Sequence, residues 1–171
     1  MKKLMLFGAL FAFVGLASYA QEAAEAVTDE DLQKYANVEV MTSNYVDAKT
    51  EELRNMILNN EVIDGGARYN EIKAAWGDEA KMAEANVTEE EKAAFQAVKD
   101  FQDALQGSVK DYKTELIMDD EILGAGTYNK VLAATKDDPA VKEKLDKMIE
   151  EMKSAQAAET DNVAEEDGSE G

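Results

Sequence analysis

A ten-residue pattern that occurs twice limits what this chain can fold into. Its shared positions are Tyr69, Asn70, Ala74, Ala75 and Asp78 in the first copy, and Tyr128, Asn129, Ala133, Ala134 and Asp137 in the second, at a constant offset. Upstream, Val27-Thr28 matches Val87-Thr88 at an offset that is one position larger. Such self-similarity usually means one supersecondary unit used again, each copy burying its apolar face on the other. We expect two tandem units, 27–85 and 86–153, within one domain, 27–153.

Apolar residues at three- and four-residue steps predict that both units are helical. Thr28 is expected to cap a helix over 29–59, and Thr88 with Glu91 forms a capping-box pattern before the equivalent helix. Shorter helices are expected from about residue 67 and after Thr127, with a new start at Asp138-Pro139. Gly107, inside the second long stripe, suggests a close approach of another helix. The predicted fold is all-α, a four-helix-type bundle made of two tandem helical hairpins.

The first twenty residues have the features of a secretory signal peptide. Lys2-Lys3 precedes an apolar run, and Ser18-Tyr19-Ala20 fits the pattern of small residues at a cleavage site. We expect cleavage after Ala20, a linker over 21–26 and a periplasmic or secreted protein; the alternative is an uncleaved membrane anchor. The acidic segment 154–171 lacks apolar periodicity and is expected to be a disordered tail.

The charge of the mature chain restricts its partners. The sequence has 18 basic and 37 acidic residues; without Lys2 and Lys3 the net charge is −21. This charge disfavours nucleic acid and anionic lipid, and we expect no stable membrane insertion after cleavage. It favours solubility, cationic partners and weak association with divalent cations. The absence of histidine and cysteine excludes the usual zinc, haem and thiol chemistry, as well as disulfides.

No pattern in the sequence predicts catalysis. The acids at 119–121 and 137–138 are neighbours in expected turns, whereas acid–base catalysis needs carboxylates held across a cleft. Calcium-loop spacing is missing as well. The repeated Tyr-Asn pair is interpreted structurally: the tyrosine packs and the asparagine satisfies local backbone groups, although the pair could instead line a polar pocket. We therefore assign no catalytic, cofactor-binding or metal-binding residues and expect no cofactor.

Two blocks of sequence resemble the bacterial domain-of-unknown-function family 4168. They are Val27 to Ala36, at the start of the domain, and Gly126 to Val141, which is similar to the Tyr-Asn-x-Ile…Asp-Pro pattern of that family. The family comprises exported, mostly helical proteins without an assigned activity, so the resemblance implies location and helical class. Together these features predict an exported, non-enzymatic protein-interaction module. The alternative is a periplasmic chaperone-like or cation-binding protein.

Overall fold

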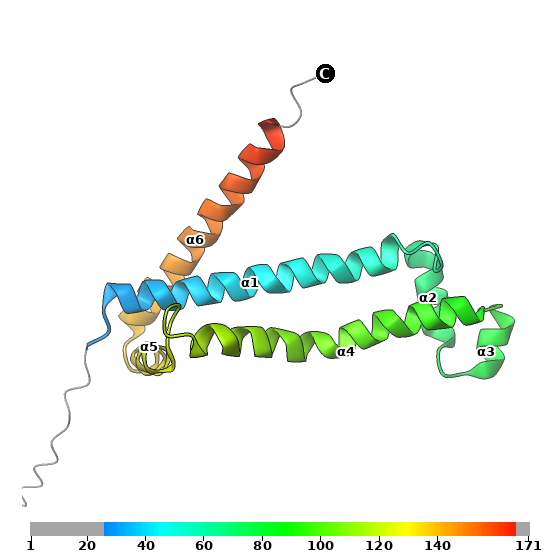
Figure 1. The fold of residues 1–171 in the computed structure, drawn as a ribbon, viewed down its shortest axis with the longest axis horizontal. Coiled ribbons are helices and arrows are strands. Elements are labelled where there is room, and N and C mark those ends of the chain that lie inside the picture. The colour runs from blue at the N-terminus through cyan, green and yellow to red at the C-terminus, as the bar shows by residue number, and fades with distance from the viewer. Residues whose placement is uncertain (1–25, 167–171) are drawn as a thin grey trace, which may run out of the picture.

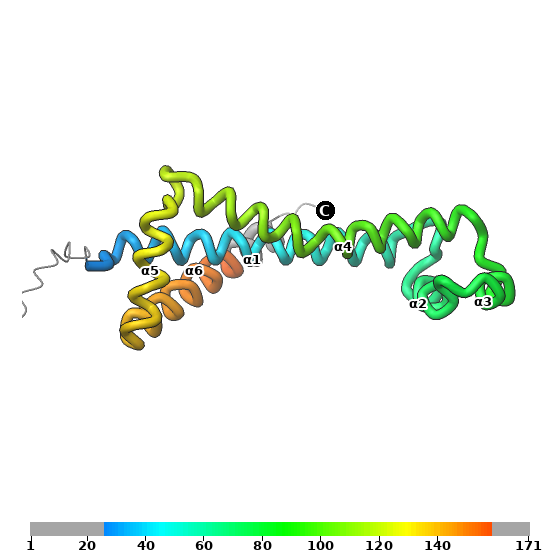
Figure 2. The backbone as a smooth tube through the Cα atoms, turned by 90° about the horizontal axis from the view of Figure 1, so that it is seen from below, coloured from blue at the N-terminus to red at the C-terminus, as the bar shows by residue number. Residues whose placement is uncertain are grey.

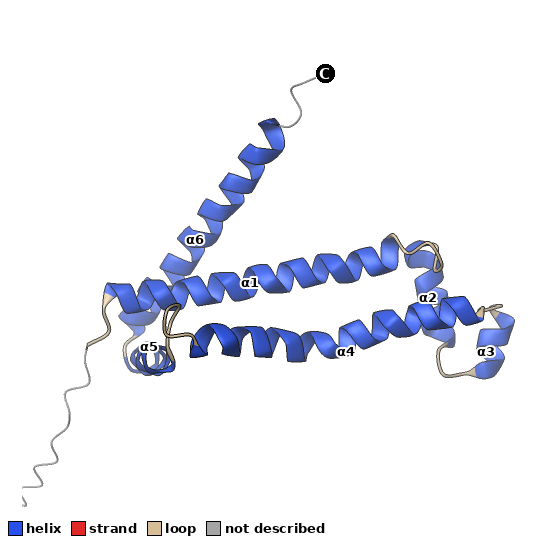
Figure 3. Cartoon of the chain, in the orientation of Figure 1, coloured by secondary structure: helices blue, strands red, loops and turns tan. Residues whose placement is uncertain are grey.

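A computed structural model describes residues 26–166, and this part of the chain is helical without strands (Figures 1 and 3). The six helices are α1 (Asp29–Leu58), α2 (Gly65–Ala75), α3 (Glu79–Glu84), α4 (Glu89–Met118), α5 (Ala125–Asp137) and α6 (Pro139–Glu166). The all-α class expected from the apolar periodicity is therefore confirmed. The expected signal peptide, 1–20, and most of the linker, 21–26, lie outside the described residues.

The two longest helices, α1 and α4, form an antiparallel pair that runs the length of the molecule (Figures 1 and 2). Each has 30 residues, a length of about 45 Å at the rise of an α-helix. Helices α2 and α3 connect them at one end of the pair, and α5 lies at the other end. Helix α6 then crosses α1 at an angle and packs on α1 and α5.

This arrangement differs from the closed four-helix bundle that we expected. In the described part of the chain, α6 contacts neither α2 nor α4. Helices α2 and α5, with 11 and 13 residues, are too short to run the length of α1 or α4. They cross the ends of the long pair instead of completing a bundle around its middle.

Both long helices begin at the caps predicted from the sequence. The Thr28 hydroxyl accepts a hydrogen bond from the Asp31 N–H at 3.1 Å, and the Asp31 carboxylate accepts one from the Thr28 N–H at 2.9 Å. Thr88 and Glu91 form the same reciprocal pair at 3.1 and 2.8 Å. These bonds satisfy N–H groups that have no partner within the helix, so both capping predictions are confirmed. The predicted start of α6 is confirmed too. The helix begins at Pro139, and the carboxylate of the preceding residue, Asp138, accepts a hydrogen bond from the Ala140 N–H.

The predicted start of the fifth helix was wrong. Its N-cap is Gly124, and Thr127 lies within the first turn of the helix. The preceding loop winds around one carbonyl oxygen, that of Asp119, which accepts from the Ile122, Leu123 and Gly124 N–H groups. Gly124 then turns the chain into α5 with φ of +79°, and a Cβ there would lie 2.9 Å from the Asp120 carboxylate. Glycine is needed at this position because other residues rarely adopt such a φ.

The acidic segment also differs from expectation, because α6 continues through 154–166, where we expected a disordered tail. The sequence here contains Ala155, Ala157 and Ala158 and no glycine or proline before Gly168. Adding residues to an existing helix is much easier than starting one, and alanine has the highest helix propensity. The rest of the expected tail, 167–171, lies outside the described residues.

Burial is concentrated at the two ends of the long pair. One apolar cluster joins α2 to the start of α4, and two further clusters join α1 to α5, α6 and the end of α4. The residues of α1 after Thr42, and those of α4 between Val98 and Leu116, are half-buried or exposed. The middle is held by contacts such as the stacked rings of Tyr45 and Tyr112, 4.3 Å apart. The close approach predicted at Gly107 was wrong, since a Cβ there would meet nothing within 4 Å.

Candidate binding grooves at the ends of the helix pair

The repeated tyrosines occupy matching positions at opposite ends of the molecule. Tyr69 lies in α2, and its ring centroid is 5.1 Å from that of Phe95 in α4. Tyr128 lies in α5, with its ring centroid 5.5 Å from that of Tyr35 in α1. Phe95 and Tyr35 are themselves equivalent positions of the repeat, related as Val87 is to Val27. Each tyrosine therefore packs on the long helix of the other half. Packing of the tyrosines is what the structural interpretation of the Tyr-Asn pair predicted.

The remaining repeat positions are not brought together into one site. Asn70, Asn129, Ala74, Ala133 and Asp137 are exposed, Ala134 is half-buried, and Ala75 is buried in the core. Asp78 caps α3 by accepting from the Ala80 and Lys81 N–H groups, each at 3.1 Å. Its counterpart in the repeat, Asp137, ends α5, and the next residue, Asp138, supplies the cap of α6. The second copy thus places the capping function on the neighbouring aspartate.

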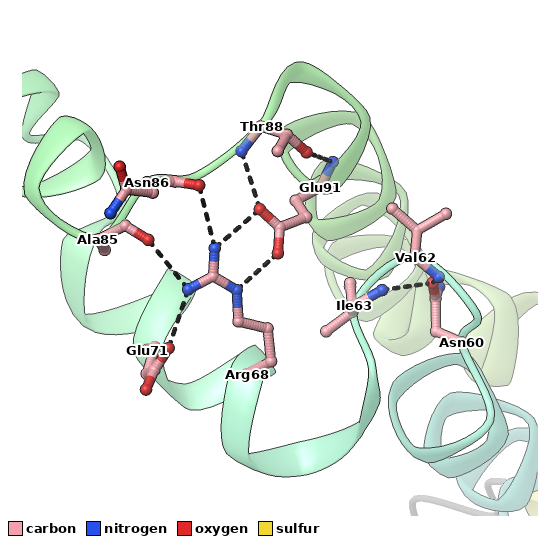
Figure 4. Close-up of polar contacts among 9 residues, drawn as sticks. All are labelled: Asn60, Val62, Ile63, Arg68, Glu71, Ala85, Asn86, Thr88 and Glu91. Atoms are coloured by element: carbon pink, nitrogen blue, oxygen red, sulfur yellow. Dashed lines mark hydrogen bonds and ion pairs between the residues drawn. The ribbon is translucent and has the colours of Figure 1, made fainter.

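Arg68, which sequence reasoning left without a function, is the most connected charged side chain at the α2 end (Figure 4). Its Nε and Nη2 donate to the two carboxylate oxygens of Glu91 at 2.5 and 2.8 Å. Its remaining contacts are the Glu71 carboxylate and the Ala85 and Asn86 carbonyl oxygens. A bidentate arginine–carboxylate pair is among the stronger hydrogen-bonded contacts in proteins. The sequence offered one signal that Arg68 has a special role: it follows shortly after a Gly-Gly turn in a chain with only two arginines.

This pair fixes the charge of both partners. The Arg68 guanidinium, with help from the Thr88 N–H, lowers the pKa of Glu91 to about 2 despite the opposing effect of burial. The pKa of Arg68 is raised in turn, first by its hydrogen bonds to Glu91. Glu91 thus serves two elements, since it completes the capping box of α4 and anchors α2 to the first turn of that helix.

The α5 end contains a corresponding ion pair. The Lys130 Nζ lies 2.8 Å from a carboxylate oxygen of Asp31, the acid of the other capping box. This hydrogen bond is the main reason that the pKa of Asp31 is lowered to about 2. Asp31 and Glu91 are equivalent positions of the repeat. At both ends of the molecule, a basic side chain of the short helix therefore pairs with the capping acid of the long helix from the other half.

A groove of about 610 Å³ lies where α6 crosses α1 and α5. Its lining residues are Tyr35, Glu39, Thr42, Ser43 and Val46 of α1, Thr135 and Lys136 of α5, and Lys142, Leu145, Asp146, Ile149 and Lys153 of α6. Burial and the neighbouring Glu39 raise the pKa of Tyr35 to about 12, so its hydroxyl stays protonated. Glu39 itself is paired with Lys113 at 2.7 Å. We name this hollow the α6 groove.

A second groove, of about 230 Å³, lies at the other end between α2 and α4. It is lined by Tyr69, Lys73, Trp76, Phe95, Lys99 and Gln102. The rings of Trp76 and Phe95 are 4.5 Å apart, and the Gln102 side-chain amide is 3.5 Å from the Tyr69 hydroxyl. Within the described part of the chain, only α4 and α2 with its C-cap, Trp76, contribute to this lining. We name it the aromatic groove.

The two grooves use matching sequence positions. At the offsets of the repeat, Phe95, Lys99, Gln102 and Trp76 of the aromatic groove correspond to Tyr35, Glu39, Thr42 and Thr135 of the α6 groove. Helix α6 covers one of these surfaces. At the other end the following helix, α3, has only six residues and packs on α2.

The acidic clusters serve local structure. Asp119 accepts from the Glu121 N–H at 2.8 Å within its turn, and Asp138 caps α6. Among residues 26–166, the side chains of histidine, cysteine, aspartate and glutamate do not gather in groups of three or more that could hold a metal ion. Among the hollows of the described surface, the α6 groove and the aromatic groove combine aromatic floors with charged rims, which suits noncovalent binding.

Comparison with protein families, with characterised proteins and with solved structures found no match. No helix in the described range is long and apolar enough to cross a membrane.

Proposed function

We propose that this chain is an exported, non-enzymatic protein-interaction module that arose by duplication of a helical hairpin. The observation that carries the binding function is the aromatic groove, whose lining includes a half-buried tryptophan next to Phe95 and two lysines. Tryptophan and tyrosine are enriched where proteins bind each other.

Several matching contacts support the duplication. The two long helices have equal lengths and begin at equivalent positions of the repeat with the same kind of cap. Each capping acid binds a basic side chain from the short helix of the other half. Each repeated tyrosine packs on the matching aromatic position of the opposite long helix. A single hairpin could not bury these surfaces alone, so two copies packed on each other form the natural folding unit.

The arrangement of the carboxylates favours binding over catalysis. The most strongly perturbed acids, Asp31 and Glu91, are held ionised by basic partners and by backbone N–H groups at helix starts. A general acid or base needs a pKa near the working pH, which these contacts oppose. The other acidic pairs serve as caps and turns. We therefore assign no catalytic residues and no cofactor.

Export is proposed from the sequence of residues 1–20 and from the resemblance to domain-of-unknown-function family 4168. In this proposal the mature protein begins at Gln21 and acts in the periplasm or outside the cell. Its net charge of −21 keeps it away from nucleic acid and from anionic membranes.

The test uses the mature chain, 21–171, incubated with a bacterial envelope extract and treated with a lysine-reactive cleavable cross-linker. We expect the same protein to be recovered in independent preparations, and its recovery to fall when Trp76 is replaced by alanine. A chain with Lys110 replaced by alanine serves as the control, because Lys110 is exposed and remote from the groove lining. Cross-linking without a reproducible partner would reject the proposal.

The alternative, a chaperone-like or cation-binding protein, rests on the charge of the mature chain. It predicts suppressed aggregation of an unfolded client protein and a measurable heat of calcium binding. If calorimetry shows no heat and aggregation is unchanged, this alternative is rejected.

A further inference from the structure

We propose that the aromatic groove between α2 and α4 binds an acidic amphipathic helix of a partner protein. This inference rests on the proposed interaction function and adds the chemistry of the partner. Helix binding in an apolar groove is a common recognition mode, in which residues at three- and four-residue spacings enter the groove.

The molecule itself contains an example of such docking. Helix α6 lies on the matching surface of α1 and α5, where it inserts an apolar stripe made of Val141, Leu145, Met148, Ile149 and Met152. These residues recur at the helical spacing that the recognition mode requires. The matching surface on α2 and α4 has no such cover among the described helices, since α3 lines a separate hollow with Val87 and Lys92 and contributes no residue to the aromatic groove. A partner helix on α4 would meet Phe95 where α6 meets Tyr35, but it would meet Lys92 and Gln96 where α6 meets Leu32 and Ala36.

The floor of the aromatic groove suits an apolar stripe. Phe95 is buried, and Trp76 and Tyr69 pack against it with centroid distances of 4.5 and 5.1 Å. Trp76 stands where the α6 groove has Thr135, so the uncovered surface is the more apolar of the two at this position. Large rings fixed by a buried neighbour contribute contact area at a low cost in conformational entropy.

The charges of the two grooves point to the sign of the partner. In the α6 groove the charges are mixed: α1 and α5 present Glu39 and Lys136, and α6 presents Lys142, Asp146 and Lys153. In the aromatic groove the residue that corresponds to Glu39 is Lys99, and Lys73 lies on the same rim. The lining contains no acidic residue, in a chain with 37 acids. Lys99 has only a long contact with Asp103, at 3.9 Å. An incoming helix therefore needs acidic side chains on both sides of its apolar stripe.

The experiment titrates the full mature chain with two synthetic peptides derived from its own sixth helix. The first peptide has the sequence of residues 139–156, and the second carries Lys142→Glu and Lys153→Glu in the same sequence. The chain has a single tryptophan, Trp76, and neither peptide contains one, so tryptophan emission reports on the aromatic groove alone. We expect saturable binding of the acidic peptide and about tenfold weaker binding of the lysine peptide.

A charge-reversed chain carrying Lys73→Glu and Lys99→Glu should show the opposite preference. The matched control carries Lys110→Glu and Lys147→Glu, which change the net charge equally at exposed positions outside both grooves. Circular dichroism confirms that the variants are folded. The proposal is overturned if Trp76 emission does not change, if both peptides bind equally, or if the control reverses the preference as well. It is also overturned if sedimentation shows a dimer that the groove variant abolishes, because the occupant would then be a second copy.

These outcomes are distinct from failure of the interaction function. If the cross-linked envelope partner is still recovered with the Lys73→Glu, Lys99→Glu chain, the interaction function stands and the aromatic groove is excluded as its site. If the peptides show the expected preferences but no partner is recovered from the envelope, the groove chemistry stands and the envelope is excluded as the source of the partner.

Discussion

Replacing Glu91 by glutamine tests how strongly the contact between α2 and α4 depends on one ion pair. The side chains of Glu91 and Arg68 are 11% and 22% exposed, so their charges are only partly screened by solvent. Glutamine keeps the size of the side chain and can still accept from the Thr88 N–H, but it removes the negative charge. Arg68 is then left with Glu71, which is exposed, and with two carbonyl oxygens.

The lowered pKa of Glu91 sets the expected size of the effect. A pKa of about 2 in the folded protein, against 4.5 in the unfolded chain, corresponds to about 3 kcal/mol at about 1.4 kcal/mol per pKa unit. Partial exposure of Arg68 reduces this figure, so we expect Glu91→Gln to lower the free energy of unfolding by about 2–3 kcal/mol near pH 7.

The pH dependence gives the prediction its sign. Because the folded-state pKa of Glu91 is lowered, its ionised form stabilises the protein above about pH 4.5, and this contribution is lost as the pH falls toward 2. The difference in unfolding free energy between the natural chain and the Glu91→Gln variant should therefore shrink to about 1 kcal/mol near pH 3.

The assay is urea unfolding followed by circular dichroism at both pH values, with Glu90→Gln as the control. Glu90 is the neighbouring acid in the first turn of α4 and is exposed. Its replacement removes the same charge from the helix start and should change stability by about 0.5 kcal/mol or less. Equal stability of the two variants near pH 7, or a Glu91→Gln deficit that persists unchanged near pH 3, would refute the reasoning.

Three further predictions concern two glycines, the hydrophobic core and the signal peptide. Gly124→Ala should lower stability by about 1–2 kcal/mol, because Gly124 has positive φ and its added Cβ would meet a carboxylate. Gly107→Ala should raise stability by up to about 1 kcal/mol. Thermal unfolding temperatures that shift in the same direction for both variants would contradict these two predictions. Phe95→Ala should cost about 3–5 kcal/mol, since this ring is buried at the centre of its cluster, and Phe101→Ala, at a half-buried position, clearly less; urea unfolding with equal losses would count against two separate end cores. Mass spectrometry of the protein exported by a bacterial host should place the mature N-terminus at Gln21. Retention of the signal peptide would reject the cleavage prediction.

Local chemistry in the sequence predicted the helices well. Thr28, Thr88 and Asp138 each supply side-chain oxygens to N–H groups that follow them directly, so the cap and the helix start are encoded within a few positions of each other. The predicted start of α5 was wrong because this start depends on a loop that winds around the Asp119 carbonyl oxygen. Apart from Gly124, such a loop has no recognisable pattern in the sequence. Periodicity also reveals nothing of how α6 crosses α1.

The grooves were less accessible to sequence reasoning. The repeat placed Tyr69 and Tyr128 at matching positions, but the partner of each lies on the other half of the chain. The contact of Arg68 with Glu91 spans 23 residues and follows from the orientation of α2 rather than from any local pattern. The open surface beside Trp76 depends on the short length of α3, which ends after six residues.

Because burial is concentrated at the two ends of α1 and α4, the middle of the pair connects two separate hydrophobic cores. Few buried contacts pass through residues 43–52 and 99–115, so loosening of one end has little reason to spread to the other. Amide hydrogens near the centre should exchange with solvent sooner than those of either end, and the chain should melt in more than one step. The same stretch also separates the aromatic groove from the α6 groove, which lie at opposite ends of the long pair.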